Sequence, residues 1–172
     1  MRLDLMIRAE VRREDRDAVR RLAESTKFFR PDEVDVAVEL VDAFLATGEA
    51  SGYEFLFAEQ NGHVVGYICY GLIGCTLGSY DVYWIVVDQQ SQGAGIGRRL
   101  LQQAEQDLAS RNARLVYIET SNKPQYAPTR QFYLRCGYQI AAVMADFYDD
   151  GDDKVVLVRD LRNSNTSSVS AI

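Results

Sequence analysis

The chain has 172 residues, a length typical of one soluble domain with a substantial core. Its 47% apolar and 26% charged residues are ordinary for a globular protein. The net charge of −6 argues against nucleic acid as a main partner, because phosphate binding requires a basic face. With three cysteines that lack metal-ligand spacing and one histidine, we expect no metal site.

The cysteines and the apolar runs indicate in which cellular compartment the protein is expected. Cys69, Cys75 and Cys136 lie in apolar stretches, and we expect reduced, buried thiols. The first ten residues lack the uncharged apolar core of a signal peptide. The apolar run Val64–Cys75 is too short to span a bilayer, which takes about 20 residues. We therefore expect a cytoplasmic protein with no membrane partner.

The N-terminal half predicts, in chain order, one strand, two helices and two further strands. Their expected ranges are 3–9, 14–25, 31–45, 53–59 and 64–73. Pro31 favours the start of the second helix and Gly48 its end, with Leu45 among the residues expected to face inward. Asn61-Gly62 separates the two strands and is a strong signal for a hairpin.

The stretch 80–101 organises the chain. A strand is predicted over Tyr80–Val87, a loop with three glycines follows, and apolar spacing predicts a helix over 96–111. Such an arrangement binds anions, because the first N–H groups of a helix lack internal partners and glycine lets the backbone approach a phosphate. Arg98 and Arg99 would oppose the helix dipole unless an anion is bound there; the alternative is that both face solvent.

The C-terminal part predicts a strand, a short helix and two final strands. Their expected ranges are 115–120, 128–135, 138–148 and 154–161. Gly137 is well placed to end the short helix, and the acidic turn Asp149–Asp153 joins the last strands. We expect one domain over residues 1–162, followed by a polar, serine-rich and disordered tail over 163–172.

The glycine spacing separates several kinds of phosphate loop. A dinucleotide loop would need glycine at position 98, and a P-loop would need a G-K-[ST] ending. The segment Gln92–Gly97 reads Q-x-x-G-x-G and, with the preceding IVVD, resembles the acyl-CoA pyrophosphate loop of the GCN5-related N-acetyltransferases, the GNAT family. The block Tyr126–Tyr138 resembles the family's later motif, a helix carrying F-Y-x-x-x-G-[FY]. The resemblance covers residues 4–162.

The resemblance implies a fold and a cofactor. The fold would be α/β, of the GNAT type, with a mixed and mostly antiparallel central sheet flanked by helices, although the element order alone would also allow a doubly wound sheet. The first two helices and their connection, residues 27–30, would cover the acceptor site; the alternative is that residues 27–30 form an apolar elbow that packs on the sheet. The cofactor would be acetyl-CoA, with CoA as product. Its pantetheine arm would lie beside Val86 and Val87, and its pyrophosphate on the N–H groups of Gln92, Gly93, Ala94, Gly95, Ile96, Gly97 and Arg98.

The resemblance also assigns chemistry to two side chains. Tyr133 matches the family's general-acid tyrosine, whose ordinary pKa of ~10 lies above the ~8.5 of a thiol, so that it can donate to a nascent thiolate. Asp81 lies eleven residues before Gln92, where histone-type members carry a glutamate base. An aspartate with a pKa of ~3.9 is a weak base toward an ammonium group with a pKa of ~10.4, so Asp81 would act through water or anchor a cationic substrate. Otherwise Tyr133 is a core aromatic and Asp81 a solvent-facing strand residue.

The chain departs from the family pattern at Tyr126. Many members carry asparagine at this place, seven residues before the catalytic tyrosine, where it contacts the cofactor arm. Asn122 lies four residues earlier and could take over that contact. Arg130 either pairs with a cofactor phosphate or faces solvent.

These residues predict an N-acetyltransferase that moves an acetyl group from acetyl-CoA to a primary amine, by direct attack in a ternary complex. The acceptor would be a small molecule or a peptide. Two alternatives stay open: a non-catalytic acyl-CoA-binding or sensing module, and a nucleotide- or flavin-binding protein that uses the same glycine loop. Dimers are a common default among soluble oligomers, and we expect a homodimer interface, where there is one, at the last strands.

Overall fold

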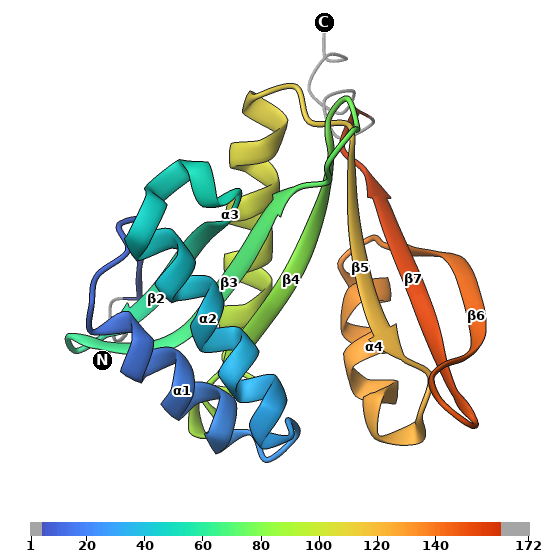
Figure 1. Ribbon diagram of the computed structural model, residues 1–172, viewed down its shortest axis with the longest axis horizontal. Coiled ribbons are helices and arrows are strands. Elements are labelled where there is room, and N and C mark those ends of the chain that lie inside the picture. Colours follow the sequence, from blue (N-terminus) through green and yellow to red (C-terminus); the bar gives the residue numbers. More distant parts are fainter. Residues whose placement is uncertain (1–4, 163–172) are drawn as a thin grey trace, which may run out of the picture. The chain divides into compact units, whose positions relative to one another are not determined.

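The computed structural model describes residues 5–162, and Figure 1 gives the arrangement of its elements. The expectations for residues 3, 4 and 163–172 lie outside this range. In chain order the elements are β1 (Met6–Arg8), α1 (Asp15–Ser25), α2 (Pro31–Thr47), β2 (Glu54–Gln60), β3 (His63–Leu72), β4 (Ser79–Val87), α3 (Ile96–Ser110), β5 (Leu115–Ser121), α4 (Ala127–Arg135), β6 (Gln139–Asp149) and β7 (Asp152–Asp160). Short 3-10 helices lie at η1 (Gly48–Ser51), η2 (Gln89–Ser91) and η3 (Pro124–Tyr126).

The strands form one sheet in the order β1-β2-β3-β4-β5-β7-β6. Strands β4 and β5 are parallel, from Ser79 opposite Leu115 to Val82 opposite Ile118. The pairs β1–β2, β2–β3, β5–β7 and β6–β7 are antiparallel. The expected mixed, mostly antiparallel α/β fold is therefore confirmed, and the doubly wound sheet is excluded because its strands would be mostly parallel.

The chain divides into two compact units. The first comprises residues up to 71 together with 83–106, and the second comprises 72–82 together with the residues from 107 onward. The expectation of a single domain over 1–162 stays a prediction.

The core of the first unit lies between the helices α1 and α2 and the strands β2 and β3 (Figure 1). Val19, Leu22, Val41 and Phe57 are fully buried in it. The inward stripe of α2 continues from Val41 to Phe44, which packs against this cluster. Leu45, expected to face inward, is instead 37% exposed, because it lies one helical position past that stripe.

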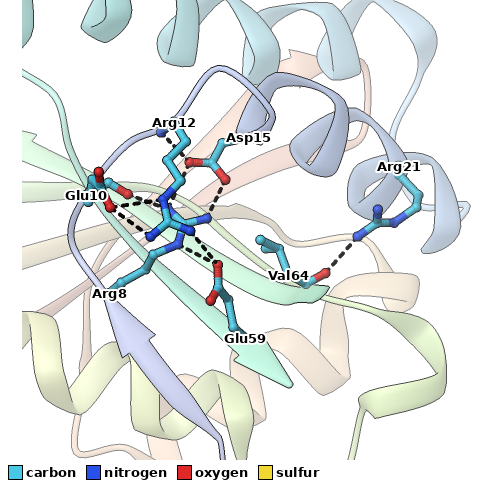
Figure 2. A network of polar contacts seen from close by, with 7 residues as sticks. All are labelled: Arg8, Glu10, Arg12, Asp15, Arg21, Glu59 and Val64. Atoms are coloured by element: carbon cyan, nitrogen blue, oxygen red, sulfur yellow. Dashed lines mark hydrogen bonds and ion pairs between the residues drawn. The ribbon is translucent and has the colours of Figure 1, made fainter. Parts of the chain in front are cut away.

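A buried ion-pair network ties β1 to α1 and β2 (Figure 2). The Arg8 guanidinium lies 2.6 Å from Asp15 Oδ1 and 2.6 Å from Glu59 Oε1, and its Cζ stands 4.6 Å from the centre of the Phe57 ring. Asp15 also accepts a hydrogen bond of 2.7 Å from the backbone N–H of Arg12. Each buried charge is thus paired and hydrogen-bonded, the condition under which a charge is tolerated inside a protein.

The second unit contains α4 and the strands β5, β6 and β7 (Figure 1). Val116, Ile118 and Leu157 of these strands are buried. Gly137 has φ +91°, and its N–H donates to Leu134 O at 3.1 Å while Tyr138 N–H donates to Tyr133 O at 3.1 Å. These two bonds form a Schellman motif, which confirms Gly137 as the residue that ends the helix.

The cysteines differ in exposure more than expected. Cys69 is buried, Cys136 is partly buried and Cys75 is exposed, and all three are free thiols. The prediction of three buried thiols is wrong for Cys75, because this residue follows β3 in an open turn with φ +63° instead of continuing the apolar strand. Within the range that the structure describes, no helix is long and apolar enough to cross a membrane.

Candidate functional site

The glycine loop of the first unit joins the end of β4 to α3. Gly93 and Gly95 have φ of +82° and +78°, in the left-handed region, whereas Gly97 lies in the first turn of α3 outside it. A Cβ at Gly93 or Gly95 would meet open space. Glycine is therefore required at these two positions by backbone conformation and not by crowding, and the loop is open to a ligand.

The N-terminus of α3 presents N–H groups directly after this loop. The first helical bond runs from Arg99 N–H to Gly95 O, at 3.0 Å, so the N–H groups of residues 96–98 precede any acceptor within the helix. Ile96 is buried and anchors the turn, while Arg98 and Arg99 are exposed. Backbone donors and two cations therefore gather where the helix dipole also favours an anion.

Polar groups at the end of β4 fix the shape of the loop. Gln92 Nε2 donates to the carbonyl oxygen of Val87 at 3.2 Å. Asp88 N–H donates to Val65 O at 2.8 Å, and Asp88 Oδ1 accepts from Gln90 N–H at 2.9 Å. The structure thus brings Val87 and Gln92 together through their own hydrogen bond.

Gly66 supports this loop and was not among the sequence candidates. A Cβ at Gly66 would lie 3.1 Å from Val86 O and 3.3 Å from Ile96 Cγ2. Because Gly66 has no Cβ, the first turn of α3 can pack directly on the sheet below the glycine loop. The signal in the sequence was a glycine inside a strand pattern, which often marks a close approach of another segment.

In the second unit, Tyr133 lies on α4 with 4% exposure. Its ring contacts those of Phe132 and Tyr138, at centroid distances of 5.1 and 5.9 Å. Its hydroxyl makes no hydrogen bond with any residue in the range 5–162. Burial raises the pKa of this phenol well above its ordinary value, and the neighbouring Cys136 adds to the rise. The group therefore stays protonated at physiological pH and keeps a proton to donate.

Asp81 lies half-buried on β4, opposite Tyr117 in the parallel ladder to β5. Burial raises the pKa of its carboxyl, the charge of Glu119 raises it further, and Lys154 opposes both. Lys154 Nζ lies 3.1 Å from Glu119 Oε2. Asp81 is consequently a better proton acceptor than an exposed aspartate.

The loop between β5 and α4 carries the three remaining candidates. Asn122 is exposed, and its N–H donates to Asp153 O at 2.8 Å. Tyr126 is half-buried at the start of α4. Arg130 Nη1 donates to the carbonyl oxygens of Ser121 at 2.7 Å and Lys123 at 3.1 Å. Arg130 therefore holds the loop against α4, a role that the two sequence expectations for it did not include.

Asp152 also holds this loop in place, a role that was not expected from the sequence. Its carboxylate accepts a hydrogen bond from Ser121 Oγ and lies 3.1 Å from Lys123 Nζ. The bond from Ser121, together with Lys123, lowers the pKa of Asp152 although desolvation opposes the shift. Asn122 therefore lies between two residues that are both fixed to β7.

The connection between α1 and α2 was expected near an acceptor. Phe29 packs edge-on against Trp84, with ring centroids 4.9 Å apart. It also helps line a pocket of about 280 Å³, whose other lining residues are Arg20, Glu24, Pro31, Val34 and Asp35. Across residues 5–162, no three His, Cys, Asp or Glu side chains are arranged to hold a metal ion.

Comparison with known proteins identifies the family. The model of the acetyltransferase (GNAT) domain matches residues 51–140, more than half of the chain. The chain belongs to the GNAT family. This confirms the resemblance on which the site residues depend, and the matched range includes the whole glycine loop and Tyr133.

Individual relatives agree with this membership. A crystal structure of a proposed GNAT acetyltransferase from Desulfovibrio desulfuricans is 44% identical, with a TM-score of 0.91 over 92% of this chain and 99% of that one. An uncharacterized N-acetyltransferase of Methanocaldococcus jannaschii is 30% identical over 113 residues, 64% of this chain and 68% of its own length. The ribosomal-protein-S18-alanine N-acetyltransferase of Escherichia coli shares the fold at 19% identity, with a TM-score of 0.72 over 92% and 94% of the two chains.

Proposed function

We propose that this protein is an N-acetyltransferase that transfers an acetyl group from acetyl-CoA to a primary amine. The observation that carries the proposal is the glycine loop at the N-terminus of α3, in a chain of the GNAT family. Left-handed Gly93 and Gly95, open space beside both, and exposed Arg98 and Arg99 suit a pyrophosphate. We assign that contact to the N–H groups of residues 92–98.

Other main-chain and side-chain groups would hold the rest of the cofactor. Val86 and Val87 would offer main-chain hydrogen bonds to the pantetheine arm, as an added strand does at a sheet edge. Asn122 and Tyr126 lie on the β5–α4 loop that Arg130 and Asp152 hold, and we assign them contacts to the same arm. Arg130 donates from Nη1 to Ser121 O, so we assign it the indirect role of holding the loop that carries Asn122 and Tyr126.

Acetyl transfer to an acceptor in its ammonium form removes two protons from nitrogen and supplies one to sulfur. After the first proton has left, the amine nitrogen forms a bond to the thioester carbon in a ternary complex. The carbon–sulfur bond then breaks, and the second nitrogen proton restores the Tyr133 phenol that has protonated the thiolate. Asp81, whose pKa burial raises, accepts the ammonium proton through water or anchors the cation beside it. Tyr133, whose pKa is also raised and whose hydroxyl has no partner among residues 5–162, gives its proton to the departing thiolate.

Two more distant relatives that share this fold support the proposed acceptor class. One is named for aminoglycoside 6′-N-acetyl transfer, at 20% identity and a TM-score of 0.73, and was solved with coenzyme A. The other is the ribosomal-protein-S18-alanine N-acetyltransferase. Both enzymes are named for acetyl transfer to nitrogen, on molecules of very different size, which supports an amine acceptor that is either a small molecule or a peptide.

The experiment is a turnover assay with acetyl-CoA and a panel of small amines and peptides. It follows release of the CoA thiol and, by mass spectrometry, a mass gain of one acetyl group on the amine. Both signals should appear together for at least one amine and should fall in an Asp81→Asn, Tyr133→Phe double variant. Tight acetyl-CoA binding without turnover on any amine would favour the acyl-CoA-sensing alternative.

A further inference from the structure

A buried lysine of the second unit lies near Asp81 but is paired with a different carboxylate. Lys154 is only 8% exposed, and its Nζ lies 3.1 Å from Glu119 Oε2. The side chain of Asp81 makes no hydrogen bond or ion pair with any residue in the range 5–162. Burial and the charge of Glu119 raise the pKa of Asp81, and the charge of Lys154 opposes this rise, so the ammonium group lies within electrostatic reach of the unpaired carboxylate.

The register of the sheet places these three charged side chains on one face. Asp81 lies opposite Tyr117, and Lys154 lies opposite Ser121. Residues two apart along a strand point to the same face, so Tyr117, Glu119 and Ser121 of β5 share that face with their partners on β4 and β7. Along β5, Glu119 therefore lies midway between the levels of Asp81 and Lys154.

Strand β7 lies between β5 and β6, and Lys154 is held from both of these neighbours (Figure 1). Glu119 of β5 accepts a hydrogen bond of 3.1 Å from Lys154 Nζ. From β6, the ring of Phe147 lies with its centre 3.7 Å from the same Nζ. A cation over an aromatic face is attracted by the ring quadrupole, more strongly where the cation is desolvated. The two contacts together fix the ammonium group on Glu119 rather than on Asp81.

We propose that Glu119 is a positioning residue of the acceptor site, which holds the Lys154 ammonium away from Asp81 and so leaves the Asp81 carboxylate open to the ammonium group of the acceptor. This inference rests on the proposed function, in which Asp81 anchors the acceptor or accepts its proton. The formal charges agree with it, because two carboxylates and one internal ammonium leave one negative charge for one cation of the substrate. A lysine paired with Asp81 would occupy the place of that cation.

Removing the charge of Glu119 should transfer the lysine to Asp81. Glu119→Gln keeps the size of a side chain that is 48% exposed, but it leaves Lys154 without its paired carboxylate. A nearby cation favours the ionised form of a carboxyl group, so the pKa of Asp81 should fall in this variant. The double variant Glu119→Gln, Lys154→Met removes both charges, and the pKa of Asp81 should rise again because burial then acts alone. A purely structural role of Glu119 does not predict this reversal.

Carbon-13 NMR titration of the Asp81 carboxyl group tests the positioning without any substrate. The midpoint of the Asp81 titration should lie at lower pH in Glu119→Gln than in the wild type, and it should move back up in the double variant. Glu39→Gln is the matched control, since it makes the same change at an exposed residue of α2 in the first unit, and it should leave the midpoint unchanged. A midpoint that does not fall in Glu119→Gln, or that stays low in the double variant, would overturn the inference.

Amine turnover by the same variants separates this inference from the proposed function. If Lys154 occupies Asp81 for about nine-tenths of the time in Glu119→Gln, the KM for the amine should rise about tenfold, with the KM for acetyl-CoA unchanged. The double variant should recover the wild-type KM for the amine. Wild-type turnover with the same amine KM in every variant would overturn the inference alone. No wild-type turnover on any amine would overturn the proposed function and the acceptor's part of the inference, while the Asp81 titration would still decide the positioning.

Discussion

Gln92 Nε2 donates a hydrogen bond of 3.2 Å to the carbonyl oxygen of Val87, so the first residue of the glycine-loop motif is fixed to the end of the strand before it. The loop conformation therefore depends on an amide donor at this position. Gln92→Glu removes the donor and places a negative charge beside the proposed pyrophosphate site. We expect the KM for acetyl-CoA to rise more in Gln92→Glu than in Gln92→Ala, with kcat less affected. Equal effects of the two variants would mean that this residue does not lie near an anion.

The two left-handed glycines should not tolerate a side chain. Gly95→Ala keeps open space around the new Cβ but forces alanine to φ +78°, a strain of about 1 kcal/mol or more. The loop should relax away from its present shape and weaken acetyl-CoA binding. Gly74→Ala is the control, because Gly74 also has open space around it but does not have a positive φ. Calorimetric titration should find weaker binding for the first variant alone.

Tyr133→Phe tests the proton donor while keeping the ring packing. The hydroxyl has no hydrogen-bond partner among residues 5–162, so its loss should leave the thermal stability nearly unchanged. If Tyr133 is the general acid, kcat should fall by about 10²-fold or more, with little change in the KM for acetyl-CoA. Tyr138→Phe makes the same change in the neighbouring ring and should retain kcat. A similar loss in both variants would assign the effect to the aromatic cluster and not to the acid.

Asp81→Asn should raise the stability of the protein at neutral pH and lower its activity. Because the folded-state pKa of Asp81 is raised, its carboxyl binds a proton more tightly in the folded than in the unfolded chain. Its contribution to stability is therefore complete below the ordinary pKa of 3.8 and is lost as pH rises through the folded-state value. At neutral pH, the asparagine variant should be more stable than the wild type.

Thermal melts across pH measure this difference. The advantage of Asp81→Asn should shrink as the pH is lowered toward 3.8, and its kcat should be about 10²-fold lower than that of the wild type if Asp81 is the base. A stability advantage of Asp81→Asn over the wild type that is no larger at neutral pH than at acidic pH would contradict the burial argument. Full activity in the same variant would remove Asp81 from the mechanism.

The Arg8 network should dominate the stability of the first unit. Arg8→Met leaves Asp15 and Glu59 without their buried partner, and breaking a buried pair in this way costs about 3–5 kcal/mol. Arg16→Met removes a solvent-exposed pair with Asp42 and should have a far smaller effect. Urea unfolding compares the two. A small effect of Arg8→Met would show that the carboxylates find other partners.

Much of the fold could be predicted because local signals agreed with one another. Asn61 and Gly62 both adopt positive φ, as the expected hairpin requires. Pro31 begins α2, and Gly48 is its C-cap, with φ +59°. The glycine motif was readable because left-handed backbone and exposed N–H groups need specific residues at specific spacing.

The rest depends on contacts between distant residues. Arg130 binds the carbonyls of Ser121 and Lys123, and nothing in the local pattern selects these acceptors over a phosphate or solvent. Gly66 matters because Ile96 of α3 packs against its backbone. The exposure of β6 could not be predicted either, because an apolar strand at a sheet edge has the same sequence pattern as one inside the sheet.

The most direct test of the account is a thermal-shift titration with acetyl-CoA, CoA, NAD and ATP in parallel. A ligand at 100 times its dissociation constant stabilises the folded state by about 2.7 kcal/mol, which is roughly 5–10 °C for a chain of this size. The proposed function predicts such a shift with acetyl-CoA and CoA and none with NAD or ATP. A shift with NAD or ATP alone would contradict the assignment of the glycine loop to acyl-CoA.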